Sequence, residues 1–240
     1  MNAASFKPRL SVALLATALS FPLPVMAETN GLSADEAADG WQLLFDGNSL
    51  EHWRGFKMEE LPAGWKVENG TIVFAPPESG TRGDIVTKEQ YENFELVVEW
   101  AVTPAGNSGI FFRVSEDASR TYSTGPEFQI LDNGGHRDGQ RAETSAAANY
   151  ALHAATSDVT RPVGEFNEAR LRVDGDQVTH WLNGEKVVEY RLWTDEWKAM
   201  VAASKFASMP GYGLNKRGHI ALQDHGDLVR FRNVKVRRLP

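Results

Sequence analysis

The sequence of 240 residues contains no cysteine, which excludes disulfide bonds and thiolate metal sites. It also lacks an excess of basic residues, because 25 Lys and Arg stand against 32 Asp and Glu and the formal charge is −7. Phosphate contacts need a basic surface, so nucleic acid is an unsuitable partner. No GxSxG, HExxH, P-loop or Rossmann-type glycine motif is present, and the enzyme classes that those motifs mark are not indicated.

Long hydrophobic runs are also scarce, and the one that exists lies at the N-terminus. Lys7 and Arg9 precede the run LSVALLATALSF, which is followed by PLP and by the small residues Val25 and Ala27. This order of basic, apolar and small residues predicts a secretory signal peptide over residues 1–27. A membrane anchor is the alternative, but the run is too short and wrongly flanked for a spanning helix. We therefore expect a periplasmic or secreted protein with no membrane association after cleavage.

The rest of the chain reads as a polar linker over residues 28–40 and a single domain over residues 41–240. Short apolar–polar alternations are separated by turn signals, among them Asn69-Gly70, Asp174-Gly175 and Asn183-Gly184. Such dipeptides are strong hairpin signals. Roughly ten strands at this spacing predict an all-β antiparallel sandwich, and no βαβ rhythm is visible.

One segment has helical character, TDEWKAMVAASKF at residues 194–206. It predicts one short helix, followed by the proline- and glycine-rich MPGYG. The helix is either a surface connection between two strands or a lid over one face of a sheet.

Strand alternation assigns the chemistry-bearing side chains to one face of the sandwich. In NSGIFFR, Asn107, Phe111 and Arg113 point opposite to Ile110 and Phe112. By the same alternation, Glu127 and Gln129 share a face in EFQI, and Gln223 and His225 share one in HIALQDH. Amides, His and Arg beside an aromatic ring suit the directional binding of sugar hydroxyls. The alternative is that these are ordinary solvent-exposed faces.

Asp132 falls out of phase in GPEFQILDNGGH, residues 125–136. Strict alternation sends its carboxylate toward the core, where an unpaired charge is costly. A β-bulge near residues 130–131 returns it to the face of Glu127 and Gln129. Glu127 and Asp132 could then serve a retaining glycosidase, which needs two nearby carboxyl groups. Alternatively, Asp132 caps the turn that follows it.

A combination of motifs then resembles a known family. The stretches that carry the resemblance are GWQLLFDGNSLEHWRG (40–55), NFELVVEW (93–100), GNSGIFFR (106–113), EFQILDNGGHRD (127–138), EFNEARLRVDGDQVTHWLNGEKVVE (165–189) and GHIALQDHG (218–226). Together they resemble the 3-keto-disaccharide hydrolase, or 3-keto-glucoside lyase/hydratase, family. The resemblance implies a concanavalin-like jelly-roll sandwich and the cleavage of glycosides oxidised at C3. Residues 119–125 and 143–155 depart from the family's pattern. Of the properties that the resemblance implies, the choice of substrate is therefore the least well specified.

The resemblance implies proton abstraction at C2 of a keto-sugar, elimination across C1–C2 and hydration of the product. This chemistry needs a base, an acid and a positive group or metal at the enolate oxygen. On the shared face, we expect Glu127 or His225 to be the base and the other to be the acid. We expect Arg113 or Lys205 to stabilise the enolate.

The remaining candidates on this face are expected to bind carbohydrate hydroxyls. They are Asn107, Gln129, Asp132, His136, Gln223 and Asp224. Asp224 has the alternative of orienting His225, since its phase points toward the core. No cofactor is required by the sequence, although His136 near Asp132 and Asp138 leaves a divalent cation open. A non-catalytic carbohydrate-binding module is the competing function, because jelly rolls often serve as lectins.

Overall fold

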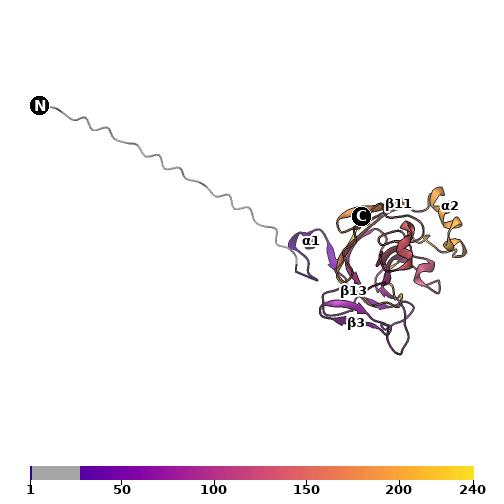
Figure 1. Ribbon diagram of the computed structural model, residues 1–240, viewed down its shortest axis with the longest axis horizontal. Coiled ribbons are helices and arrows are strands. Elements are labelled where there is room, and N and C mark those ends of the chain that lie inside the picture. Colours follow the sequence, from indigo (N-terminus) through magenta and orange to yellow (C-terminus); the bar gives the residue numbers. More distant parts are fainter. Residues whose placement is uncertain (2–27) are drawn as a thin grey trace.

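The computed structural model describes Met1 and residues 28–240. Apart from Met1, the predicted signal peptide therefore lies outside the described residues. Within residues 28–240, thirteen strands form two antiparallel sheets, and Figure 1 shows them packed as layers of a sandwich. The predicted all-β jelly-roll sandwich is thus confirmed.

The larger sheet, called sheet A here, has eight strands within the described residues. They are β1 (Trp41–Leu43), β3 (Trp65–Glu68), β4 (Thr71–Phe74), β6 (Phe94–Val102), β9 (Asn167–Asp174), β10 (Gln177–Leu182), β11 (Glu185–Arg191) and β13 (Val229–Arg238). Their spatial order is β11-β10-β9-β6-β13-β4-β3, with β1 paired to β13. The three predicted hairpin turns join β3 to β4, β9 to β10 and β10 to β11. Asn69 and Gly70 have φ of 50° and 71°, the left-handed conformation that a two-residue hairpin turn requires.

The smaller sheet, sheet B, has five strands in the part of the chain that the structure describes. They are β2 (Trp53–Gly55), β5 (Ile85–Thr87), β7 (Asn107–Val114), β8 (Glu127–Leu131) and β12 (His219–Leu222). Their order is β2-β5-β12-β7-β8. The short strands β1, β2 and β5 have only three residues each, too few for alternation to reveal them, which explains why the sequence predicts fewer strands.

The two sheets differ in how their outer faces are covered. Strand β9 alternates between buried and partly exposed residues, as expected when one face meets the core and the other meets water. Strands β7 and β8 are buried at every position. Their inner residues, such as Ile110 and Phe128, join the core between the sheets, so the outer face of sheet B must be covered by loops.

Short helices complete the described residues. They are α1 (Ala34–Ala38), α2 (Asp195–Ala203) and the 3-10 helices η1 (Thr121–Ser123), η2 (Arg137–Gln140), η3 (Ala142–Thr144) and η4 (Lys205–Ser208). The predicted helix over residues 194–206 is therefore α2 with η4 directly after it. Thr194 caps α2 by accepting a hydrogen bond from the Trp197 backbone N–H at 3.1 Å. No helix in the described residues is long and apolar enough to cross a membrane.

Helix α1 lies inside the segment that the sequence presents as a linker. Its N-cap, Ser33, forms a reciprocal capping box with Glu36. Glu36 also pairs with Lys235 of β13, and the Asn30 side chain accepts a hydrogen bond from the Asn233 N–H at 2.8 Å. Residues 28–40 are thus folded against sheet A, and Figure 1 shows α1 and α2 on opposite sides of the molecule.

Candidate active site

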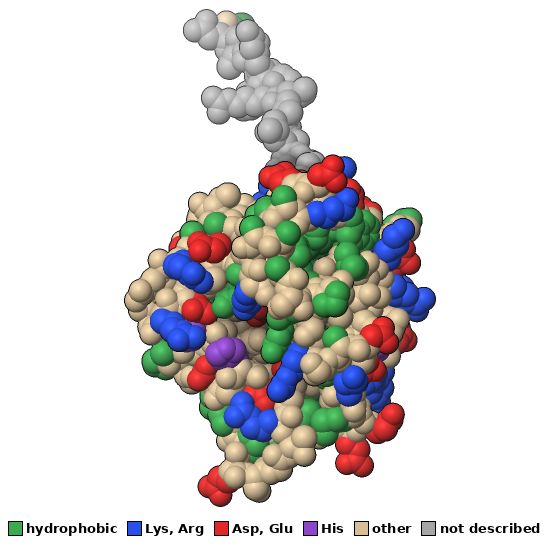
Figure 2. All heavy atoms as spheres, turned by 90° about the vertical axis from the view of Figure 1, so that its right-hand side faces the viewer, with side chains coloured by type: hydrophobic (Ala, Val, Ile, Leu, Met, Phe, Trp, Pro, Cys, Tyr) green, Lys and Arg blue, Asp and Glu red, His purple; other side chains and the backbone are tan. Residues whose placement is uncertain are grey.

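A cavity of about 160 Å³ lies on the outer face of sheet B, over β7 and β8. Eight residues line it: Asn107, Tyr122, Glu127, Gln129, Tyr150, Lys205, Gln223 and His225. Figure 2 shows a hollow on the side of the molecule that carries α2, with a histidine side chain at its rim. Six of the predicted site residues are therefore brought together from four separate parts of the chain.

The pairing of β7 with β8 gives the cavity its floor. Gly109 pairs with Gln129 and Phe111 with Glu127, without a register shift. A Cβ atom at Gly109 would lie 2.2 Å from Glu127 Oε1. The absence of a side chain at position 109 therefore leaves the room that the Glu127 carboxyl group occupies.

Glu127 is the buried carboxyl group of this floor, with 7% of its surface exposed. Burial raises the pKa of Glu127 to about 8; the charge of Lys205 opposes this, and Asp84 and Asp138 add to it. Because a carboxyl group in an apolar setting disfavours its ionised form, Glu127 holds its proton at neutral pH more firmly than an exposed glutamate. Once ionised, it is a stronger base.

Lys205, the first residue of η4, brings a positive charge to the same cavity. Its Nζ atom lies 4.1 Å from the centroid of the Tyr150 ring, within cation–π range. Loss of solvation lowers the pKa of Lys205, while the carboxyl groups of Glu127 and Asp138 oppose that shift. Tyr150 is itself held by a hydrogen bond that its hydroxyl donates to Asp138 Oδ2 at 3.0 Å.

Three amide side chains offer hydrogen bonds in the cavity. Asn107 Oδ1 and Gln223 Oε1 are buried and have no hydrogen-bond partner. Gln129 is fixed instead, because its Oε1 accepts from the Ile130 N–H at 3.1 Å and its Nε2 donates to Thr144 O at 3.4 Å. Buried polar atoms are normally paired, and these two carbonyl oxygens can accept hydrogen bonds from the hydroxyl groups of a ligand.

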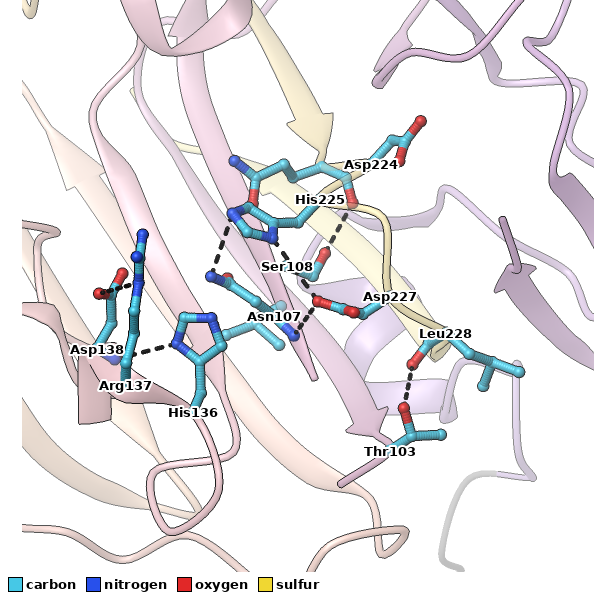
Figure 3. Close-up of polar contacts among 12 residues, drawn as sticks. Thr103, Asn107, Ser108, His136, Arg137, Asp138, Asp224, His225, Asp227 and Leu228 are labelled. Atoms are coloured by element: carbon cyan, nitrogen blue, oxygen red, sulfur yellow. Dashed lines mark hydrogen bonds and ion pairs between the residues drawn. The ribbon is translucent and has the colours of Figure 1, made fainter. Parts of the chain in front are cut away.

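His225 stands at the rim with 44% of its side chain exposed. Its Nε2 lies 3.4 Å from Asn107 Nδ2 and its Nδ1 lies 3.7 Å from Asp227 Oδ2. The same Asp227 oxygen accepts the Asn107 backbone N–H at 3.2 Å. Figure 3 shows Asp227 beside both residues, so this carboxylate orients the histidine and the asparagine together.

Arg113 does not reach the cavity, which corrects one sequence-based expectation. Phe112 and Arg113 together lie opposite the single residue Ile220, because β7 and β12 shift register there. Arg113 adopts φ of 53°, and this bulge turns its side chain away from the outer face. The guanidinium donates to Glu92 O at 2.9 Å and to Gly175 O at 2.8 Å, so Arg113 is withdrawn as the group that stabilises an enolate.

Asp132 also lies outside this cavity, and the predicted bulge at residues 130–131 is wrong. The pairing of β7 and β8 is regular through Leu131, and Asp132 follows the end of the strand. Its Oδ2 accepts from the Ala105 N–H at 2.7 Å and its Oδ1 from the Gly134 N–H at 3.0 Å. Asp132 therefore has the turn-capping role that was the alternative, and it is not a second carboxylate beside Glu127.

Asp224 is engaged elsewhere. Its side chain is 2% exposed and pairs with Arg82, while its backbone N–H donates to Asp84 Oδ1 at 2.9 Å. Figure 3 shows its carboxylate pointing away from the His225 ring. Asp224 therefore neither binds a ligand in this cavity nor orients His225, and Asp227 takes the orienting position.

His136 lies next to the cavity without lining it. Its ring centroid is 6.2 Å from that of His225, and its Nδ1 accepts the Asp138 N–H at 3.1 Å as the cap of η2. In the described residues, no group of three or more His, Asp or Glu side chains is arranged to hold a metal ion. The divalent cation stays an expectation from the sequence, and we derive no step through one.

Sequence reasoning missed Tyr122, Tyr150 and Asp227. Tyr122 lies in the 3-10 helix η1 and Tyr150 in a turn, so no strand periodicity marks them. Both fall in the stretches 119–125 and 143–155 that depart from the family pattern. Asp227 is three residues after Asp224 and four after Gln223. Only the bend after β12 determines which of the two aspartates faces the histidine.

A covered jelly-roll face with a buried carboxyl group, an ammonium and free amide oxygens suits acid–base chemistry on a carbohydrate. Comparison with known proteins makes the assignment specific, because the sequence profile of the 3-keto-alpha-glucoside-1,2-lyase-like domain matches residues 40–237. The chain belongs to this family. Its membership confirms the predicted resemblance and favours an enzyme over a non-catalytic binding module.

Individual relatives agree with this assignment. The chain is 35% identical to a 3-keto-disaccharide hydrolase from Bacteroides thetaiotaomicron, over 89% of this chain and 83% of that protein. A crystal structure of a candidate glycosyl hydrolase from Parabacteroides distasonis has a TM-score of 0.81 at 32% identity, covering 89% of this chain and all of the other. A second such protein from that organism has a TM-score of 0.64 at 28% identity, covering 83% and 99%.

Proposed function

We propose that this protein cleaves glycosides whose sugar carries a ketone at C3, by elimination followed by hydration. The observation that carries the proposal is Glu127, a buried carboxyl group with a pKa of about 8 in a cavity that also holds an ammonium group. The name of the Bacteroides relative, a 3-keto-disaccharide hydrolase, supports the same substrate class.

In the proposed reaction, Glu127 removes the proton from C2, and the electron pair forms an enolate with the C3 carbonyl. A base is most effective when its pKa lies near the working pH, and the raised pKa of Glu127 meets that condition. The Lys205 ammonium faces the same cavity and stabilises the negative charge on the enolate oxygen. Arg113, the other candidate for this role, is too far removed by its bulge.

Cleavage of the C1–O bond then gives an unsaturated ketone and releases the leaving group as an alkoxide. His225, at the rim beside Asp227, donates a proton to the departing oxygen. Water adds to C1 and a proton returns to C2, so that the net change is hydrolysis. Asn107, Gln129 and Gln223 bind the sugar hydroxyls during both steps.

One expectation from the sequence is kept in this proposal and another is dropped. The N-terminal segment supports a periplasmic or secreted location, where extracellular glycosides are met. The ordinary retaining glycosidase is not proposed, because it requires Asp132 as a partner for Glu127 and Asp132 caps a turn instead.

The test is to incubate the purified protein with a 3-keto-glucoside and with the parent glucoside, and to follow the released aglycone. We expect turnover of the keto compound alone, and exchange of the C2 hydrogen with solvent deuterium. Glu127→Gln should lower kcat/KM by about 10²- to 10⁴-fold, the range for a general base. Cleavage of the parent glucoside at a similar rate, or full activity of Glu127→Gln, contradicts the proposal.

A further inference from the structure

A second and larger cavity, of about 520 Å³, lies beside the first on sheet B. Its lining includes Phe56 just after β2, Asp84 just before β5 and Asp224 just after β12. The first cavity lies over β7 and β8, at the other end of the strand order β2-β5-β12-β7-β8. The two cavities therefore follow one another across the strands.

The two cavities share their dividing wall. Thr121 lines the second cavity and Tyr122 the first; in the same way, Asp224 lines the second and His225 the first. Two backbone segments thus contribute consecutive residues to opposite sides. Asp84 ties these segments together, because it accepts hydrogen bonds from the Thr121 hydroxyl and from the Asp224 N–H.

The proposed role of His225 places the leaving group beside this wall. His225 stands at the rim of the first cavity, and the proposed proton transfer to the departing oxygen occurs there. The part of the substrate beyond that oxygen then lies next to residues 224–225, at the entrance of the second cavity.

The second cavity is basic, although the whole chain has a formal charge of −7. Lys57, Arg82 and Arg120 line it, against the carboxyl groups of Asp84 and Asp224. Asp224 is already paired with Arg82, and Asp84 is half-buried and accepts two hydrogen bonds. Lys57 and Arg120 are exposed. Lys57 Nζ donates one hydrogen bond, to Ala118 O at 3.1 Å, and its other two donors can serve a ligand.

We propose that the second cavity binds the leaving group of the glycoside and selects one that carries a negatively charged substituent, such as a uronic acid. This inference rests on the proposed function, since it places the remainder of the same substrate. Charged guanidinium and ammonium groups form the strongest hydrogen bonds with carboxylates, and the hydroxyls of Thr81 and Ser119 suit the rest of a sugar.

The experiment compares three 3-keto-glucosides of one anomer, whose leaving groups are methanol, glucose through its 4-hydroxyl and glucuronate through its 4-hydroxyl. The last two have similar leaving oxygens and differ mainly in charge. We expect kcat/KM for the glucuronate compound to exceed that for the glucose compound by about tenfold, the worth of one charged hydrogen bond. Added salt should reduce this preference, because the exposed charges are screened.

Variants Lys57→Gln and Arg120→Gln should each lose most of the preference for glucuronate over glucose. Arg172→Gln, on the outer face of sheet A and paired with Asp174, is the matched control and should keep it. Suppose that the methyl keto-glucoside is cleaved. Equal rates on the two disaccharides, or a preference that both cavity variants retain, then overturns the inference and leaves the proposed function standing. Failure to cleave the methyl compound overturns the proposed function itself, and this inference with it.

Discussion

At the scale of single residues, the environment of one carboxyl group decides the chemistry. Glu127 lies on the outer face of a strand, a position that in most sheets meets water. Here loops cover the face, and the lost hydration raises the pKa of Glu127 to about 8. The same residue type at the same strand position would be an ordinary surface glutamate if those loops were absent.

The raised pKa of Glu127 predicts how stability changes with pH. The unfolded chain loses this proton near pH 4.5, whereas the folded chain keeps it up to about pH 8. The folded state therefore binds more protons between these values, and this contribution to the free energy of unfolding falls as the pH rises through that window. Over the whole window, this contribution changes by roughly 5 kcal/mol.

Glu127→Gln removes this titration, so the variant should be more stable than the wild type at pH 8.5 and similar to it at pH 5. Urea unfolding at the two pH values measures the difference directly. If the free energy of unfolding falls equally in both proteins between pH 5 and pH 8.5, the pH dependence comes from other groups.

At Gly109, a single added methyl group should affect both stability and activity. Its Cβ atom would lie 2.2 Å from Glu127 Oε1, so Gly109→Ala must displace the carboxyl group. We expect a loss of about 1–3 kcal/mol in stability, as for other overpacked sites, and about 10²-fold in kcat/KM, because the base is misplaced.

Gly218→Ala is a poor control for this variant, since its Cβ would meet the backbone of Arg113 at 2.4 Å. Gly134→Ala is a better one, because its nearest atom is Asp132 Oδ1 at 3.6 Å, an ordinary contact, and Gly134 lines neither cavity. If Gly109→Ala retains wild-type kcat/KM, the carboxyl group is not confined as the structure indicates.

At the scale of elements, the segment of α2 and η4 is held in place by stacked rings. His153 and Tyr190 stack at 4.5 Å, Tyr190 and Trp197 at 5.6 Å, and Trp197 and Tyr212 at 6.1 Å. Tyr212 stacks in turn on Phe206 of η4 at 3.9 Å. Helix α2 itself does not line the cavity, but this stack positions η4 and hence Lys205.

Trp197→Ala should therefore weaken both stability and activity. Removal of a buried tryptophan costs about 3–5 kcal/mol, and the loss of the stack should loosen η4 and reduce kcat more than KM. Trp197→Phe keeps an aromatic ring and should recover most of both. Thermal unfolding and steady-state kinetics of the two variants, with Trp181→Ala on β10 of sheet A as a control, provide the measurement. If Trp197→Ala is stable and has a normal kcat, the aromatic stack does not position Lys205.

At the scale of the whole molecule, the two sheets have divided roles. Sheet A carries α1 against β13 through the Glu36–Lys235 pair, and sheet B carries both cavities. Stabilising contacts on sheet A are thus separated from the chemistry by the full thickness of the core.

Deletion of residues 28–39 should lower the free energy of unfolding by about 2 kcal/mol, because it removes the contacts of α1. It should leave kcat/KM unchanged. Denaturant unfolding and kinetics of the shortened protein test both statements, and Glu36→Ala provides a milder comparison. A loss of activity without a loss of stability would show that α1 communicates with sheet B.

The architecture and most of the site follow from local sequence features. Alternation identifies the long strands, and the Asn-Gly turns fix the hairpins, since these signals depend on neighbouring residues only. The same alternation assigns Asn107, Glu127, Gln129, Gln223 and His225 to one face, and the cavity contains all five. Strand geometry is regular enough for such an assignment whenever no bulge intervenes.

Only the tertiary structure decided where the regular alternation of side chains along the strands is interrupted. A bulge lies at Phe112–Arg113, where β7 pairs with β12, and none lies at residues 130–131, where β7 pairs with β8 in regular register. Asp132 and Asp224 found partners distant in sequence, in Ala105 and Arg82. The chain by itself thus determined the sandwich and its polar face, whereas burial by distant loops determined which of the polar residues became a reactive group.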